Sequence, residues 1–254
     1  MATFLRKIYE VLSCFSTATH TSMCNDLLQQ LIKGKSKKDN LVRHFVDALE
    51  ENKTISHIER PFIPESRGNK TGRNPVASVM ANSSPLKIRI SPETNYEFSF
   101  LSREIPLLRA MTRKEQTDKG WIDYVAMSAS RPVLGEIKWK GDKNPFYAFV
   151  QLLTYLSEIA TPNQIKRSID HRLFGRDILA ISAFELHIFL ANFNDKGGKG
   201  PLIEQTRLLA SAFKNRLHSD FPEAATCLGN VLCISARIEG KSNSFAETKC
   251  QWMV

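Results

Sequence analysis

Apolar residues recur at steps of three and four positions in the first part of the chain. They form two groups, Leu27, Leu28, Leu31 and Ile32, and then Leu41, Val42, Phe45, Val46 and Leu49. This spacing puts the apolar side chains on one face of a helix. We therefore expect a helical N-terminal region over residues 1–58. The basic segment 33–38 between the groups is expected to be a solvated loop, with a phosphate-contacting finger as the alternative.

Residues 59–85 interrupt this helical period. They contain four prolines and two glycines, many Ser and Asn residues, and more basic than acidic side chains. Such a composition without a hydrophobic period is typical of a linker or loop. The sequence thus predicts a basic linker between the helical region and a C-terminal domain over residues 86–254.

The C-terminal part alternates between short strand patterns and longer helical ones. Residues 86–90 and 96–100 alternate in polarity, and the segment between them fits either a hairpin turn or a helix start at Ser91-Pro92. A short helix is expected near residues 104–113. Further strands are predicted over residues 121–127, 133–139, 184–193 and 231–238, and helices over 144–159 and 203–217. This order predicts an α/β fold with a mixed central sheet flanked by helices.

Charged residues on two of the predicted strands form the candidate site. Glu136 and Lys138 are two positions apart, so both side chains project from one face of a strand. Asp123 lies on the preceding strand, and pairing of the two strands would bring its carboxylate to Glu136. Two carboxylates are suitable ligands for Mg²⁺, which can activate water, and a nearby ammonium can stabilise charge on a phosphate under attack. The group therefore indicates phosphodiester hydrolysis.

A structural interpretation of the same residues competes with this one. A Glu-x-Lys pair is common on the polar face of a half-exposed hairpin, and Lys140 continues the alternation. The apolar flanks Val133, Leu134 and Trp139 instead favour a buried strand, where charges are costly unless they pair or serve a function.

Asp123 followed by Glu136-Ile-Lys138 resembles the motif of the PD-(D/E)XK nuclease superfamily, although Ile122 stands where the family motif has proline. Gln151 and Tyr155 are similar to the Q-x-x-x-Y motif of its RecB-type and phage-exonuclease-type branches. The resemblance implies a restriction-endonuclease-like mixed central sheet flanked by helices.

The resemblance also implies roles for individual residues. Mg²⁺ or Mn²⁺ would be bound by Asp123, Glu136, the backbone carbonyl of Ile137 and Glu104, the last by its position before the first site strand. Lys138 would assist the attacking water, Gln151 would brace the site, and Tyr155 would lie near the nucleic-acid backbone.

Composition agrees with an anionic partner. The chain has 254 residues, a formal charge of +9 and a pI near 9.4. A basic balance favours a polyanionic partner, either nucleic acid or a membrane surface, and the family resemblance implies nucleic acid, DNA first. The residues expected to contact its backbone are Lys140, Lys166, Arg167 and Arg172, with a solvated loop as the alternative for the last three.

The five cysteines contain no C-x-x-C pair, which argues against a disulfide framework or a zinc site and favours a reducing compartment. No apolar run is long enough for a membrane span. We therefore expect a soluble cytoplasmic protein, with the nucleoid or nucleus as further options.

The expected function is that of a metal-dependent nuclease. The alternative is a non-catalytic nucleic-acid-binding or protein-interaction module on the same fold. The N-terminal helices are expected to serve as a specificity module, a homodimer contact or a docking site for a protein partner.

Overall fold

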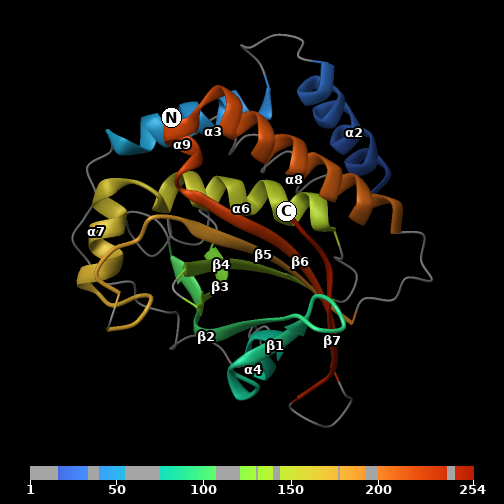
Figure 1. Cartoon of the computed structure of the whole chain (residues 1–254), viewed down its shortest axis with the longest axis vertical. Helices are drawn as coiled ribbons and strands as arrows, with labels where there is room; N and C mark the ends of the chain where they lie inside the picture. Colours follow the sequence, from blue (N-terminus) through green and yellow to red (C-terminus); the bar gives the residue numbers. More distant parts are fainter. Residues whose placement is uncertain are drawn as a thin grey trace, which may run out of the picture.

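The structure is a computed structural model that describes residues 17–33, 40–54, 75–106, 121–129, 131–139, 144–176, 178–192, 200–238 and 244–254. In these residues helices come first, a run of strands follows, and helices alternate with strands only after residue 138 (Figure 1). In order they are α2 (Thr17–Lys33), α3 (Leu41–Lys53), α4 (Pro75–Asn82), β1 (Leu86–Arg89), β2 (Asn95–Pro106), β3 (Trp121–Ser128), β4 (Arg131–Lys138), α6 (Pro145–Ile159), α7 (Pro162–Asp170), β5 (Phe184–Ala191), α8 (Gly200–Asp220), α9 (Pro222–Ala225), β6 (Leu228–Ile238) and β7 (Phe245–Met253).

The strands form a closed barrel in the order β1-β2-β3-β4-β5-β6-β7. The ring closes where β1 runs parallel to β7, with Arg89 opposite Lys249. Thr248 Oγ1 also donates a hydrogen bond to the carbonyl oxygen of Lys87 across this seam, at 3.1 Å. The expected restriction-endonuclease-like open sheet flanked by helices is therefore wrong, because a restriction-endonuclease-like sheet has two free edges and this one has none.

The physical cause of closure is the last strand. β7 pairs antiparallel with β6 and carries the C-terminal segment round to β1. Register shifts in the β2–β3 ladder, between Phe100 and Ser102, and in the β6–β7 ladder add local curvature, as β-bulges do. Strand pairing elsewhere is mixed: β4, β5 and β6 are mutually parallel, and helices α6 to α9 provide the crossovers that parallel strands need.

Several elements predicted from the sequence are confirmed. Residues 86–90 and 96–100 form a hairpin rather than the alternative helix start, and the strands and helices expected after residue 120 are present within a few residues of their predicted ends. The short helix expected near residues 104–113 is wrong at its start, because Glu104 lies within β2, while residues 107–113 lie outside the described residues. Within the expected linker, residues 75–82 form helix α4.

Two apolar cores lie on the two faces of the sheet. The interior of the barrel is filled from β1 to β6 and by α4, with residues such as Val76, Phe98, Tyr124 and Phe189. The outer core packs the other face of β3 to β6 against α6 and α8, and α2 and α3 belong to it. Figure 1 shows α2, α3, α6 and α8 gathered on one side of the sheet, with α4 on the opposite side near β1. No helix in the described ranges is long and apolar enough to cross a membrane.

Strand β4 takes part in both cores because its side chains alternate. Val133 and Ile137 point into the barrel, and Leu134 points toward α6. Gly135 lies on the interior face, directly opposite Tyr124 in the β3–β4 register. A Cβ atom at Gly135 would overlap the Tyr124 ring, which is fully buried. The absent side chain therefore makes room for the ring.

We predict that Gly135→Ala lowers the free energy of unfolding by about 2 kcal/mol, the usual cost of overpacking a core. Urea denaturation followed by circular dichroism measures the change. The Gly135→Ala/Tyr124→Leu double variant should lose less than the sum of the two single variants, since leucine lacks the overlapping ring atoms. An unchanged urea midpoint for Gly135→Ala would show that the ring moves without cost.

Candidate active site

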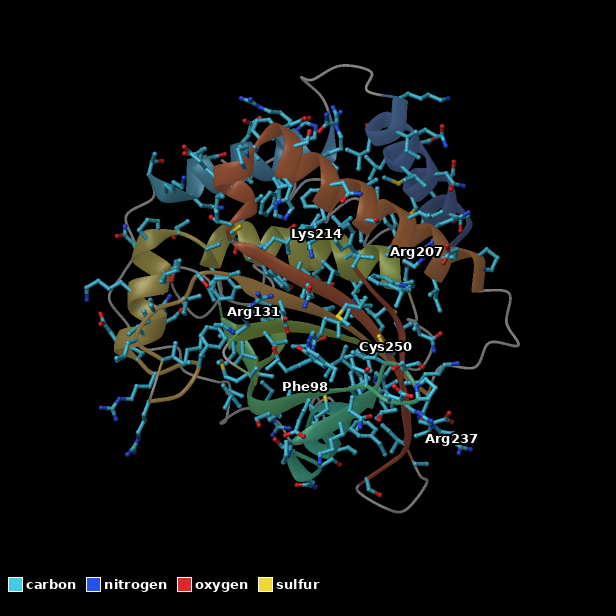
Figure 2. All side chains as sticks on the ribbon, in the orientation of Figure 1. Phe98, Arg131, Arg207, Lys214, Arg237 and Cys250 are labelled. Atoms are coloured by element: carbon cyan, nitrogen blue, oxygen red, sulfur yellow. The ribbon has the colours of Figure 1, made fainter. Side chains whose placement is uncertain are left out.

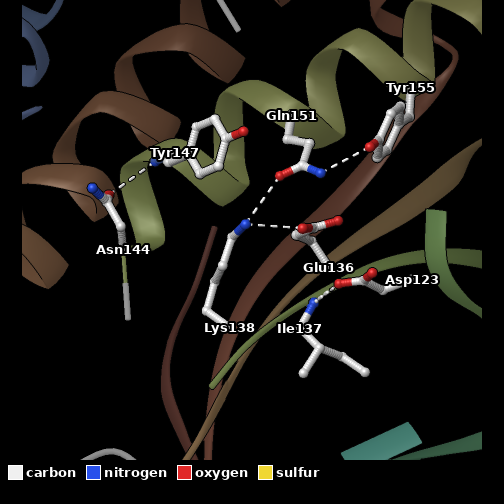
Figure 3. A network of polar contacts seen from close by, with 8 residues as sticks. All are labelled: Asp123, Glu136, Ile137, Lys138, Asn144, Tyr147, Gln151 and Tyr155. Carbon is white, nitrogen blue, oxygen red and sulfur yellow. Dashed lines mark hydrogen bonds and ion pairs between the residues drawn. The ribbon is translucent and has the colours of Figure 1, made fainter. Parts of the chain in front are cut away.

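The β3–β4 pairing brings the two predicted carboxylates together. Tyr124 lies opposite Gly135 in this antiparallel ladder, so the next position on each strand puts Asp123 opposite Glu136. Asp123 Oδ2 accepts a hydrogen bond of 2.7 Å from the backbone N–H of Ile137 (Figure 3). The pKa of Glu136 is raised well above its usual range, first by burial and then by the Asp123 charge, while Lys138 opposes the shift. The two carboxylates therefore act on each other directly.

Lys138 is held inside the protein beside this pair. Its side chain is 5% exposed, and its ammonium lies 2.9 Å from Glu136 Oε1 and 3.1 Å from Gln151 Oε1. The same ammonium lies 4.3 Å from the centre of the Tyr147 ring, a cation–π contact. Gln151 in turn donates from Nε2 to the hydroxyl of Tyr155, at 2.8 Å. Figure 3 shows this chain of contacts running from β4 to α6.

Helix α6 places these partners by its start and its spacing. Asn144 caps the helix, since its side-chain oxygen accepts from the backbone N–H of Tyr147 at 3.0 Å, and Pro145 takes the first helical position. Tyr147, Gln151 and Tyr155 follow at intervals of four residues, which lie on one line of a helix. That line faces β4, so all three side chains reach the site.

Tyr147 and His20 also contribute to the site, and neither was expected from the sequence. Tyr147 extends the Q-x-x-x-Y spacing by one further step of four toward the N-terminus, and this signal was available in the sequence. The ring of His20, on α2, stacks on Tyr147 with 6.2 Å between centroids and 7° between planes, and also contacts the Asn144 side chain. No local pattern could reveal His20, because it lies more than 120 positions before its partners.

The donor set suits a divalent cation. Glu136 Oε2 is buried and accepts no hydrogen bond from the part of the chain that the structure describes, and its carboxylate adjoins that of Asp123. Two acceptor groups held together in this way need a proton or a cation between them. The N–H of Ile137 points to the Asp123 side, and in a strand the carbonyl of the same residue points the same way. Asp123, Glu136 and the Ile137 carbonyl thus fit the predicted role of metal ligands.

The structure does not describe a contact between Glu104, the other predicted metal ligand, and this group of residues. Glu104 lies on β2, and its side chain is outside the described residues. In the described ranges, no set of three or more His, Cys, Asp or Glu side chains is arranged to hold a metal. The fit therefore rests on two carboxylates and a backbone carbonyl.

The four basic residues expected to contact nucleic acid differ in their surroundings. Lys166 is exposed on α7 and pairs with Asp170, and Arg172 is exposed just after that helix. Arg167 is buried, and its guanidinium donates to Gln164 Oε1 at 3.1 Å, so this side chain belongs to the packing of α7 rather than to an outer surface. Burial also lowers the pKa of Arg167. Lys140 lies outside the described residues.

Comparison of the chain with protein-family models, with curated proteins and with solved structures finds no match in any of the three. The function is therefore inferred from the arrangement of Asp123, Glu136 and Lys138.

We predict that Asp123→Asn stabilises the protein in EDTA, by about 1–2 kcal/mol at pH 8. Asparagine can still accept from the Ile137 N–H, and its NH₂ group can donate to the unsatisfied Glu136 Oε2. The substitution also removes a like charge beside Glu136. Urea denaturation of the variant and the parent protein, each with EDTA, measures the difference.

The Asp123–Glu136 pair also determines whether the stability of the protein rises or falls with pH. Glu136 has a raised pKa in the folded state, so between its ordinary pKa of 4.5 and that raised value the unfolded chain releases a proton that the folded chain keeps. This group therefore makes the protein less stable as the pH rises through that interval. The gain from Asp123→Asn should be larger at pH 8 than at pH 5, and a gain that shrinks with rising pH would contradict the assignment.

Proposed function

We propose that this protein is a metal-dependent nuclease that hydrolyses phosphodiester bonds of nucleic acid, with DNA as the expected substrate. The observation that carries the proposal is the buried Lys138 ammonium beside two adjoining carboxylates, one of which has an oxygen with no hydrogen-bond donor among the described residues. The resemblance to PD-(D/E)XK motifs supports the proposal at these residues only, since the closed barrel does not share the expected fold.

The carboxylates and the lysine would have different roles in catalysis. Asp123, Glu136 and the Ile137 carbonyl would hold Mg²⁺ or Mn²⁺, which when bound lowers the pKa of water and offsets charge on a phosphate. Asp123 is half-exposed, whereas Glu136 and Lys138 are buried, so the phosphate would approach from the Asp123 side. Lys138 would direct its positive charge at the reacting phosphate and the attacking water.

The residues of α6 would keep Lys138 in place. The Gln151 oxygen accepts from the ammonium, and Tyr155 fixes the orientation of the Gln151 amide by accepting from its nitrogen. The Tyr147 ring covers another side of the ammonium. A catalytic group held by three neighbours has little freedom to leave its productive position.

A reducing, cytoplasmic setting is part of the proposal. Cys24, Cys227, Cys233 and Cys250 are free thiols, and burial raises the pKa of Cys24 and of Cys227 to about 12. Such thiols stay protonated and unreactive at neutral pH.

We predict that the purified chain cleaves end-labelled single- or double-stranded DNA with Mg²⁺ or Mn²⁺ and that EDTA abolishes cleavage. Lys138→Met should lower the rate at least about 100-fold, because it removes the charge that stabilises the transition state while keeping an apolar stem of similar length. Product formation on denaturing gels gives the rates.

Lys53→Met is the matched control, since Lys53 is exposed on α3 and pairs only with Glu50 among the charged groups described. It should cleave as fast as the parent protein. DNA binding without cleavage, by a folded protein in either metal, would contradict the nuclease and favour a non-catalytic nucleic-acid-binding module. Cleavage that Lys138→Met retains would remove Lys138 from the mechanism.

A further inference from the structure

His20 joins helix α2 to the first turn of α6, next to Lys138. Helix α2 packs mainly against α8 and meets α6 at fewer positions (Figure 1). His20 is buried, with 6% of its surface exposed, and it contacts three residues at the start of α6: Asn144, Phe146 and Tyr147. The first turn of α6 is therefore held by a residue that is far away in the sequence.

The hydrogen bond between His20 and Asn144 has a defined direction. Asn144 Oδ1 accepts from the backbone N–H of Tyr147 at 3.0 Å, in its role as the cap of α6. The amide nitrogen of Asn144, which can only donate, forms a hydrogen bond with His20 Nδ1. His20 Nδ1 is therefore the acceptor, and the histidine fixes the cap residue in the orientation that the helix needs.

The Tyr147 ring contacts both His20 and Lys138. The planes of the His20 and Tyr147 rings differ by 7°, with 6.2 Å between their centroids, so the two rings are stacked with an offset. The Lys138 ammonium lies 4.3 Å from the centre of the Tyr147 ring. Phe146 contacts His20 in an edge arrangement, with 6.4 Å between centroids, and so holds the histidine from a further direction. These contacts restrict the Tyr147 ring, and the ring in turn restricts the ammonium.

We propose that His20 is a positioning residue, which holds the Tyr147 ring against the Lys138 ammonium. His20 acts on Lys138 through this ring, so it is not itself a catalytic residue. Its importance for catalysis rests on the proposed nuclease function, whereas its effect on Lys138 can be measured without that function. Helix α2 thereby supports the active site itself, which is a role beyond the specificity module, homodimer contact or docking site expected for the N-terminal helices.

The Tyr147 ring gives Lys138 an NMR signature that is independent of activity. Protons above the face of an aromatic ring resonate upfield, so the ε-CH₂ protons of Lys138 should appear upfield of those of exposed lysines. In protein with carbon-13 in its lysine side chains, Lys138→Met identifies the signal by its loss. His20→Ala should remove most of the upfield shift, because the Tyr147 ring can then move away from the ammonium.

Cleavage kinetics test the role in catalysis. In His20→Ala, kcat for DNA cleavage with Mg²⁺ should fall about tenfold or more at an unchanged KM, because a displaced catalytic group slows the chemical step without weakening substrate binding. His20→Asn should give an intermediate rate, since its side-chain oxygen can still accept from Asn144. Each rate is divided by the fraction of folded protein, measured by circular dichroism, so that lost stability is not counted as lost catalysis.

Two controls use residues outside these contacts. His218→Ala makes the same substitution at an exposed position in the last turn of α8. Arg207→Ala changes the same helical layer, since Arg207 lies on α8 at the protein surface (Figure 2) and pairs with Glu204. Both variants should keep the Lys138 signal and the kcat of the parent protein.

Three results would overturn the proposal. The first is a parent protein without an upfield Lys138 signal, since no ring would then cover the ammonium. The second is an unchanged upfield shift in folded His20→Ala, or in His20→Asn where the alanine variant does not fold. The third is a parent-like kcat per folded molecule in the same variant. If the parent protein does not cleave DNA, the nuclease proposal fails, and the upfield shift alone decides whether His20 positions Lys138.

Discussion

An ammonium group buried inside a protein needs compensation for the water it has lost, and Lys138 receives it from three sides. Glu136 supplies a carboxyl oxygen at 2.9 Å, Gln151 an amide oxygen at 3.1 Å and Tyr147 the face of its ring. Breaking a buried pair of this kind costs several kcal/mol, since the remaining charge stays unpaired. Because two of the three partners come from α6, the same contacts that surround the Lys138 ammonium also fix this helix on β4. The contacts of the candidate site are therefore also part of the packing between α6 and β4 in the outer core.

Strand β4 connects this site to the rest of the barrel. Its outward residues Glu136 and Lys138 serve the carboxylate site, and its inward residues Val133 and Ile137 fill the barrel. Gly135 has no side chain, which leaves room for the Tyr124 ring. The Tyr124 hydroxyl is connected to Glu185 by hydrogen bonds through His187 and Tyr96. One short strand thus separates two polar sites, and each has its own set of partners. A small displacement of β4 would therefore change the geometry of both polar sites.

The site was more predictable from the sequence than the fold. Glu136 and Lys138 share a strand face by simple alternation, and Asp123 meets them because neighbouring strands along the chain commonly pair. Closure depended on β7, whose residues alternate weakly between exposed and half-buried positions and so resemble a surface segment. Glu104 was expected on a short helix near residues 104–113, whereas in the structure it lies on β2, which ends at Pro106. The contact of His20 with Tyr147 arises from tertiary packing, which spacing along the chain does not encode.

The proposed function requires Asp123 and Glu136 to bind a divalent cation together. A crystal structure of the protein grown with Mn²⁺, with diffraction data collected at a wavelength where manganese scatters anomalously, tests this directly. We expect one anomalous peak between the two carboxylates, within about 2.3 Å of an oxygen of each and of the Ile137 carbonyl oxygen. Carboxylates that remain in contact with no such peak, in crystals saturated with Mn²⁺, would show that a shared proton rather than a metal joins them.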